Sequence, residues 1–147
     1  MAKNHFSIPC ASYLLLVDNN KVLLLRRFNT GYRDGMYSLV AGHLEEKETP
    51  EQCMIREAEE EVGILLKPED LKVVHVMHRI DKEYGGQRVD YFLTAKQWQG
   101  TPRNMEPHKC DDLSWFTVQN LPPNTLDYIQ HVIVSWSKGI FYSDFGF

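Results

Sequence analysis

Apolar residues gather in short runs along the first third of the chain. Residues 8–17 and 22–27 are rich in Leu and Val, and the polar residues between them tolerate left-handed turn conformations. This pattern predicts a β-hairpin. We expect another short strand at 36–41, between polar loops at 29–35 and 42–47.

The strongest helix signal follows these strands. Thr49 is an N-cap candidate, Pro50 fits the first helical position, and Gln52 can complete a capping box. Gly63 can adopt a left-handed conformation without a Cβ clash, so it is a natural stop. The sequence therefore predicts a helix over residues 50–62.

The second half of the chain repeats the order of strands followed by a helix. Residues 71–80 and 88–96 are strand-like and flank a turn, which predicts a second hairpin. Residues 98–110 carry Gly, Pro and Asn and are expected to form a loop. A short strand is predicted at 113–118.

A second helix is predicted over residues 126–138, where apolar side chains recur at helical spacing. Asn124 or Thr125 is its expected cap, and Gly139 its expected end. The element order predicts an α/β fold of the α+β kind, with a mixed sheet and a helix on each face. Since no repeat or linker divides the chain, we expect one domain over residues 1–147.

Composition narrows the class of protein. The chain has 147 residues, of which 43% are hydrophobic and 24% charged, and its formal net charge is −4. That balance argues against long nucleic acid as a partner, which would favour a basic surface. Three scattered cysteines (Cys10, Cys53 and Cys110) and no long apolar run predict free thiols, a cytoplasmic location and no membrane association. Monomer and homodimer both remain open.

The first helix carries an unusual concentration of carboxylates. Glu57, Glu60 and Glu61 are three and four residues apart, so they share a helix face. Like charges at that spacing repel one another, and a multivalent cation would reverse the sign of this effect. Hard oxygen ligands suit Mg²⁺ or Mn²⁺, which also bind phosphate oxygens. The simpler alternative is a solvated acidic face.

Residues 42–64 extend this acidic cluster into a recognisable motif. The run GHLEEKETPEQCMIREAEEEVGI resembles the Nudix box, G-x5-E-x7-R-E-U-x-E-E-x-G-U, in which U is apolar. Every fixed position is filled, by Gly42, Glu48, Arg56, Glu57, Glu60, Glu61 and Gly63. The resemblance implies a Nudix-type α/β/α sandwich with a mixed β-sheet.

The resemblance also implies a site for metal-assisted hydrolysis of a diphosphate linkage. Glu57, Glu60 and Glu61 would hold Mg²⁺, or alternatively Mn²⁺, and the carbonyl of Ala41 would be a further ligand. Arg56 would orient the catalytic glutamates through a bridge with Glu48, and Gly42 would let its loop bend tightly. The general base stays open among Glu60, Glu57 and Glu106.

The segment before the box departs from the family pattern. Many members read Leu-Pro-Gly-Gly, whereas this chain reads Leu39-Val40-Ala41-Gly42. The rigid φ of a proline and the permissive φ of a glycine are both missing. We expect this departure to affect the rigidity of the loop and not the reaction.

A second segment, from Asn104 to Cys110, resembles the N-x-E-P-x-K-C stretch of some Nudix nucleoside triphosphate pyrophosphohydrolases. By this resemblance Glu106 would complete the metal site from outside the helix, and Lys109 would contact the substrate. Arg26 and Arg27 end a strand and can grip a phosphate bidentately. Tyr32, Tyr37 and Tyr91 are candidates for stacking on a base.

These features favour a Mg²⁺-dependent enzyme that converts a nucleoside triphosphate to the monophosphate and pyrophosphate. One alternative is hydrolysis of a nucleoside diphosphate linked to another group, such as ADP-ribose, although no proline lies between Pro68 and Pro102 as that type tends to have. The other alternative is a non-catalytic module that senses nucleotides. No box glutamate is missing, which favours the enzyme.

Overall fold

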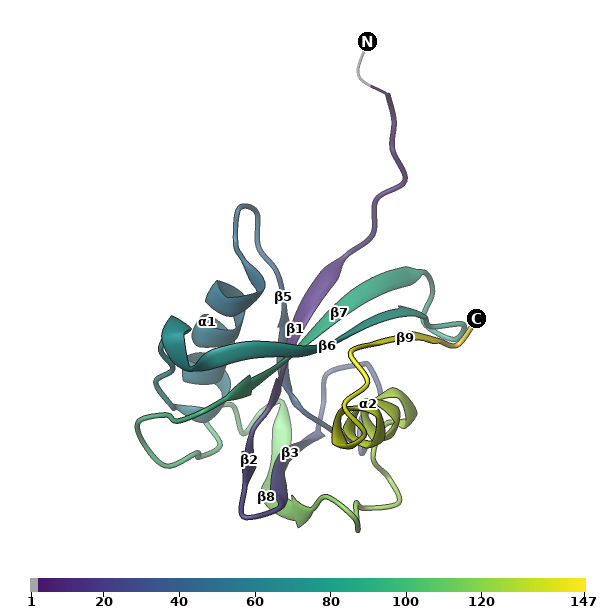
Figure 1. Ribbon diagram of the computed structural model, residues 1–147. Helices are drawn as coiled ribbons and strands as arrows, with labels where there is room; N and C mark the ends of the chain where they lie inside the picture. Colours follow the sequence, from purple (N-terminus) through teal and green to yellow (C-terminus); the bar gives the residue numbers. More distant parts are fainter. Residues whose placement is uncertain (1–2) are drawn as a thin grey trace.

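The computed structural model describes residues 3–147 and is built around a five-stranded mixed sheet (Figure 1). In spatial order its strands are β5 (Val40–His43), β1 (Cys10–Leu15), β7 (Gln87–Ala95), β6 (Leu71–Ile80) and β9 (Tyr142–Phe145). The β1–β7 and β6–β9 pairs are parallel, and the β1–β5 and β6–β7 pairs are antiparallel. The predicted mixed sheet and the predicted second hairpin are both confirmed.

A second, smaller sheet lies beside the first. It contains β2 (Val17–Asp18), β3 (Lys21–Arg27), β4 (Tyr37–Ser38) and β8 (Cys110–Thr117), all antiparallel and arranged around β3. The end of β3 therefore brings Arg27 close to the loop that precedes β8, because Arg27 is paired with Cys110.

Two α-helices cover opposite faces of the mixed sheet, as predicted. Helix α1 (Pro50–Val62) packs on β1, β5 and β7, whereas α2 (Asp127–Ser137) packs on β6. Two clusters of buried hydrophobic side chains fill the spaces between the sheet and the two helices. Strand β1 contributes to both, because Tyr13 and Leu15 lie in the cluster on the α2 side and Leu14 lies in the cluster on the α1 side. A single 3-10 turn, Pro68–Asp70, follows α1. Within residues 3–147, no helix has the length and apolar character needed to cross a membrane.

The first predicted hairpin is only partly right. Its turn is present, with β2 paired to β3, but β1 leaves for the other sheet and pairs with β5 and β7. The single strand predicted at 36–41 is divided between the two sheets, as β4 and β5. The chain passes from one sheet to the other between β1 and β2 and again between β4 and β5. Strands that follow one another in sequence therefore do not pair at these two points.

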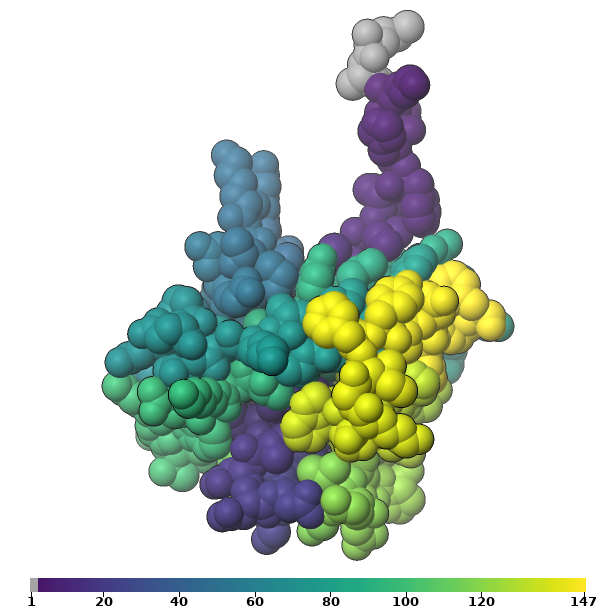
Figure 2. Space-filling view, in the orientation of Figure 1, coloured from purple at the N-terminus to yellow at the C-terminus, as the bar shows by residue number. Residues whose placement is uncertain are grey.

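Two predictions near the C-terminus are corrected. The N-cap of α2 is Leu126, which has no side-chain hydrogen bond to the helix, and neither Asn124 nor Thr125 caps it. Thr125 instead donates its hydroxyl to the carbonyl of Pro122. Strand β9 was not expected. Residues 3–9 and the loop between β5 and α1 stand out from the body of the molecule (Figure 2).

Candidate active site

Helix α1 begins and ends as its sequence predicts. The Thr49 side chain accepts the backbone N–H of Gln52, and the Gln52 side chain accepts that of Thr49, so the capping box is complete. Gly63 closes the helix in a left-handed conformation with φ of 69°. Three buried side chains on one stripe of the helix (Met54, Ala58 and Val62) anchor it on the sheet. The neighbouring stripe carries Glu57 and Glu61.

A cleft of about 890 Å³ runs beside this helix. Its walls come from both sheets, from α1, from α2 and from the loop before β8. All four candidate carboxylates line it, namely Glu57, Glu60, Glu61 and Glu106. The structure therefore brings the predicted metal-binding residues and the distant Glu106 into one cavity, whose size is in the usual range for small-molecule sites.

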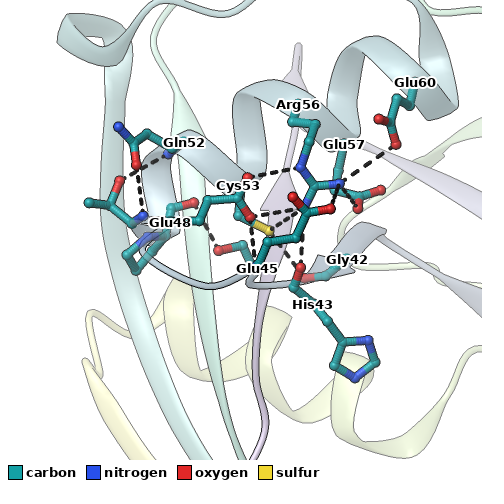
Figure 3. A network of polar contacts seen from close by, with 12 residues as sticks. Gly42, His43, Glu45, Glu48, Gln52, Cys53, Arg56, Glu57 and Glu60 are labelled. Atoms are coloured by element: carbon teal, nitrogen blue, oxygen red, sulfur yellow. Dashed lines mark hydrogen bonds and ion pairs between the residues drawn. The ribbon is translucent and has the colours of Figure 1, made fainter.

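Arg56 is the centre of a network of ion pairs at one side of the cleft (Figure 3). Its guanidinium binds both oxygens of Glu48, at 2.8 and 2.9 Å, which confirms the predicted bridge. It also donates to a Glu57 oxygen at 2.5 Å and lies 3.7 Å from Glu60. Hydrogen bonding from Arg56 lowers the pKa of Glu48 to about 2. Arg56 is therefore held in a fixed position, from which it orients Glu57.

Among the carboxylates of α1, Glu61 lies on the side away from Arg56, and no arginine in the described part of the chain is bound to it. Burial raises the pKa of Glu61 well above its usual value, and the nearby charges of Glu57 and Glu106 raise it further. Burial also raises the pKa of Glu57, although Arg56 acts in the opposite direction. The backbone N–H of Ala41 donates to Glu61 at 3.1 Å. One neutral donor leaves most of the charge of Glu61 uncompensated.

Gly42 has a different role from the one predicted. It lies within β5, and its φ is not among the positive values, so no tight bend requires it. A Cβ added at Gly42 would instead overlap the carboxylate of Glu57. Glycine is needed here because the Glu57 side chain packs directly against the backbone of β5.

The departure just before the box is explained by strand pairing. Val40, Ala41 and Gly42 belong to β5 and are paired with β1, in the register Ala41 to Tyr13. The hydrogen-bonded ladder keeps this segment extended without a proline. The effect on rigidity and the ligand role of the Ala41 carbonyl both stay predictions.

Backbone contacts explain how Glu106 reaches the helix. The N–H of Arg103 donates to the carbonyl of Val62 at 3.0 Å, and that of Met105 donates to the carbonyl of Glu61 at 3.1 Å. Asn104 uses both ends of its amide within the loop, since it accepts the N–H of Glu106 and donates to the carbonyl of Cys110. The loop is thus fixed to the last turn of α1, and Asn104, which also lines the cleft, holds the backbone of Glu106.

The donor set fits a hard divalent cation. Carboxylate oxygens are the ligands that Mg²⁺ and Mn²⁺ prefer, and burial together with neighbouring carboxylates raises the pKa of Glu57 and Glu61, an effect that a bound cation would oppose. Within residues 3–147, no three His, Cys, Asp or Glu side chains are already grouped to hold a metal ion. Glu57 is turned toward Arg56, so a cation would have to draw its free oxygen into the cleft.

The predicted substrate-binding residues separate into two groups. Arg27 and Lys109 line the cleft, and Arg27 donates to the carbonyl of Tyr32 at 2.6 Å. Arg26 points elsewhere, because it forms an ion pair with Asp111 at 2.7 Å and is not part of the cleft lining. The ion pair with Asp111 thus holds Arg26 outside the cleft that contains the carboxylates.

The stacking candidates also separate. Tyr32 lines the cleft, whereas Tyr37 is buried, donates to Asp112 and packs edge-on against Phe116. Tyr91 is partly buried against the core on the α1 side. Only Tyr32 of the three is placed where a ligand in the cleft can reach it.

Sequence reasoning missed a whole region of the cleft lining, at the end away from α1. It contains Tyr13, Arg79, Asp81, Tyr84, Arg88 and Tyr128. A signal was present in the sequence, since Arg79 and Asp81 are two residues apart, as are Arg88 and Asp90. Polar residues at that spacing share one face of a strand, which in a hairpin predicts a buried ion-pair network.

Comparisons with known proteins agree with the fold and with the box. The family model of the NUDIX domain matches residues 8–136, which is most of the chain. A NAD-capped RNA hydrolase NudC from Stutzerimonas stutzeri is 30% identical over 125 residues, covering 80% of this chain. The match covers 40% of that relative, so the chain spans about two fifths of the length of the curated relatives that it matches.

Solved structures show the same architecture. The crystal structure of a MutT NUDIX hydrolase from Burkholderia pseudomallei has a TM-score of 0.80 and 26% sequence identity, and the match covers 88% of this chain and 98% of that one. A bifunctional NMN adenylyltransferase/ADP ribose pyrophosphatase from Francisella tularensis has a TM-score of 0.71 at 21% identity, covering 92% of this chain and 42% of that one. The second likeness shows the fold alone.

Proposed function

The chain belongs to the Nudix family of hydrolases, and from this premise we propose that it hydrolyses a diphosphate linkage in a nucleoside triphosphate. The products would be a nucleoside monophosphate and pyrophosphate, and the reaction would require Mg²⁺, with Mn²⁺ as a substitute. The observation that carries this proposal is the gathering of Glu57, Glu60, Glu61 and Glu106 in one cleft with too little positive charge.

Each residue of the cleft has a proposed role in this reaction. Glu57, Glu60 and Glu61 are the proposed metal ligands, and Glu106 would join them from the loop before β8. A bound divalent cation supplies charge neutralisation on the phosphates and a more acidic water. Arg56 holds Glu57 at a defined angle, and Glu48 fixes Arg56 in turn. Arg27 and Lys109 are the proposed phosphate contacts.

The water must lose its proton to a nearby carboxylate. A good general base has a pKa close to the working pH, and burial moves the pKa of Glu57 in that direction. Arg56 occupies one oxygen of Glu57, so the other oxygen can serve either as a metal ligand or as the base, and not as both at once. Glu60 and Glu106 lie in the same cleft and remain the alternative bases.

A second candidate function follows from the curated relatives. They are named NAD-capped RNA hydrolases, which makes a diphosphate that joins two nucleosides a reasonable alternative substrate. The net charge of −4 argues against a long RNA as the main source of affinity. A small dinucleotide such as NAD would be the form of this alternative that suits the cleft.

One assay separates the two functions. The purified chain is incubated with Mg²⁺ and a panel of nucleoside triphosphates, ADP-ribose and NAD, and the products are separated chromatographically. We expect pyrophosphate and a monophosphate from at least one triphosphate, and none without a divalent cation. Faster cleavage of NAD than of every triphosphate would favour the second function, and no turnover of any compound would refute both.

A further inference from the structure

The cleft continues beyond the carboxylates into a second part, which we call the inner lobe. Its lining is formed by Tyr13, Arg79, Asp81, Tyr84, Arg88 and Tyr128. These residues come from β1, β6, β7, α2 and the turn between β6 and β7. The proposed metal ligands are all at the α1 side, so the chemistry of the diphosphate leaves the inner lobe without a role.

Arg79 is the most informative residue of the inner lobe. It is only 2% exposed, and yet it lines the cleft. Its Nε donates to Asp90 at 2.6 Å, its Nη2 donates to the Tyr13 hydroxyl at 3.3 Å, and its Cζ lies 3.7 Å from the ring centre of Tyr128. Nη1 is 3.8 Å from an Asp81 oxygen, which is within ion-pair range but beyond hydrogen-bond distance. A buried charged group therefore keeps one donor for a ligand.

The balance of charges in the inner lobe argues against a phosphate group as its ligand. Three arginines (Arg33, Arg79 and Arg88) and three carboxylates (Asp81, Glu83 and Asp90) form the ion pairs around the inner lobe, so the network is neutral. A phosphate would meet no net positive charge there and would lie beside the carboxylate of Asp81. The lobe therefore suits a neutral group, and its tyrosine rings suit a flat one.

Two tyrosines at the mouth of the inner lobe are held by one carboxylate. Asp81 accepts the hydroxyl of Tyr32 at 2.7 Å and the backbone N–H of Tyr84 at 3.0 Å. The two rings meet edge to face, with centres 4.6 Å apart. Arg33 lies over the Tyr84 ring, with its Cζ 5.0 Å from the ring centre, and the side chain is still 49% exposed, so part of the ring is accessible to another planar molecule. This arrangement is a preformed stacking surface.

We propose that the inner lobe binds the nucleobase of the substrate, and that it prefers a base with an exocyclic carbonyl oxygen over adenine. The base stacks on Tyr84, and Nη1 of Arg79 donates to the carbonyl. A guanidinium has no acceptor, so it opposes the amino group that adenine presents at the equivalent position. This inference rests on the proposed function, since it assigns the base of the same nucleotide.

The first test measures selectivity in the wild-type chain. Values of kcat/KM with Mg²⁺ are compared for GTP, ITP, UTP and ATP. We expect the best carbonyl-bearing base to exceed ATP by about tenfold or more, which is the discrimination of one good arginine contact. Comparing kcat/KM for GTP and ITP with that for UTP shows whether the inner lobe prefers a purine or a pyrimidine. Equal values for all four nucleotides would overturn the proposal.

Two variants locate the selectivity. Arg79→Lys keeps the charge beside Asp90 but loses the planar fork, so the preference over ATP should fall to about threefold or less. Tyr84→Ala should raise KM for all bases by about fivefold or more while leaving their ranking unchanged. Tyr142→Ala is the matched control, because that tyrosine is 52% exposed on β9, outside the cleft. Full selectivity in a folded Arg79→Lys chain would contradict the role of Arg79.

A binding experiment separates this inference from the proposed function. GMP, IMP, UMP, AMP and NMN are titrated into the metal-free protein, and intrinsic fluorescence reports binding. Tighter binding of a carbonyl-bearing ligand than of AMP, weakened in Tyr84→Ala, supports the inner lobe even if no nucleotide is hydrolysed. This readout also covers the case in which Arg79→Lys does not fold. If triphosphates are hydrolysed without base preference and AMP binds as tightly as GMP, the inference fails and the proposed function stands.

Discussion

Glu61→Gln should make the metal-free protein more stable while it makes the enzyme slower. Glu61 lies four residues after Glu57 on α1, and burial together with Glu57 raises the pKa of Glu61 well above its usual value. Its main local contact is the backbone N–H of Ala41, which a glutamine oxygen can accept equally well. The substitution therefore removes an unfavourable charge and keeps the hydrogen bond.

The expected magnitudes follow from the arrangement of the charges. Like charges at this spacing cost about 0.2–0.5 kcal/mol on an exposed helix, and more where burial reduces solvation. For a chain of this size, 0.5 kcal/mol raises Tm by about 1–2 °C. Mg²⁺ at a hundred times its Kd stabilises the wild type by about 2.7 kcal/mol, and a tenfold weaker Kd roughly halves that gain. Turnover should fall by about 10² or more.

The stability gained by Glu61→Gln should depend on pH. The folded-state pKa of Glu61 lies above that of the unfolded chain, near 4.3, so the wild type loses stability as pH rises through and beyond that value. The advantage of Glu61→Gln should thus be small near pH 4 and largest at pH 7 to 8. Thermal melts in EDTA across this pH range measure the difference in stability between the two proteins. A Mg²⁺ titration at pH 7.5 measures how much the cation stabilises each of them.

Glu59→Gln is the matched control for this experiment. Glu59 is an exposed glutamate on the same helix and does not line the cleft. Its substitution should leave both the Mg²⁺ response and the turnover close to those of the wild type. The reasoning is refuted if Glu61→Gln melts no higher than the wild type in EDTA, or if Mg²⁺ stabilises the two proteins equally.

Three further substitutions test other parts of the site. Arg56→Ala should reduce turnover more than it weakens Mg²⁺ binding, because Arg56 orients Glu57 and is not a ligand; calorimetry and kinetics showing equal losses would contradict this. Gly42→Ala should displace the Glu57 carboxylate and lower turnover by about 10² with little change in Tm, and normal turnover would show that Glu57 tolerates the shift. Glu106→Gln should raise the Mg²⁺ concentration for half-maximal rate, and an unchanged concentration would remove Glu106 from the metal site.

Local signals made α1 predictable from the sequence. Its capping box, its proline and its closing glycine act through contacts within a few residues, and the shared face of Glu57, Glu60 and Glu61 follows from helix geometry alone. The bridge between Arg56 and Glu48 was also accessible, because both belong to the same motif. Predictions of this kind depend little on the rest of the fold.

Strand partners and the inner lobe depended on contacts between distant residues. The nearly continuous apolar run of β1 is typical of a strand buried on both faces, and that signal outweighs the turn that favoured a hairpin. The network of Arg79, Asp90 and Tyr128 joins β6, β7 and α2, and no spacing in the sequence specifies α2 as a partner. Glu106 was placed by its resemblance, whereas its anchoring to α1 is visible only in the structure.

The position of the carboxylates is set by the hydrophobic stripe beside them. Met54, Ala58 and Val62 are buried against the sheet, and Glu57 and Glu61 each precede a member of that stripe by one residue. Burying a Met or Val side chain contributes about 1.5–3 kcal/mol, which exceeds the few tenths that repulsion between two helix carboxylates costs. Packing therefore holds the two glutamates together at the edge of the core, where solvation is poor. Arg56 offsets this on the side of Glu57, and the side of Glu61 is left for a cation.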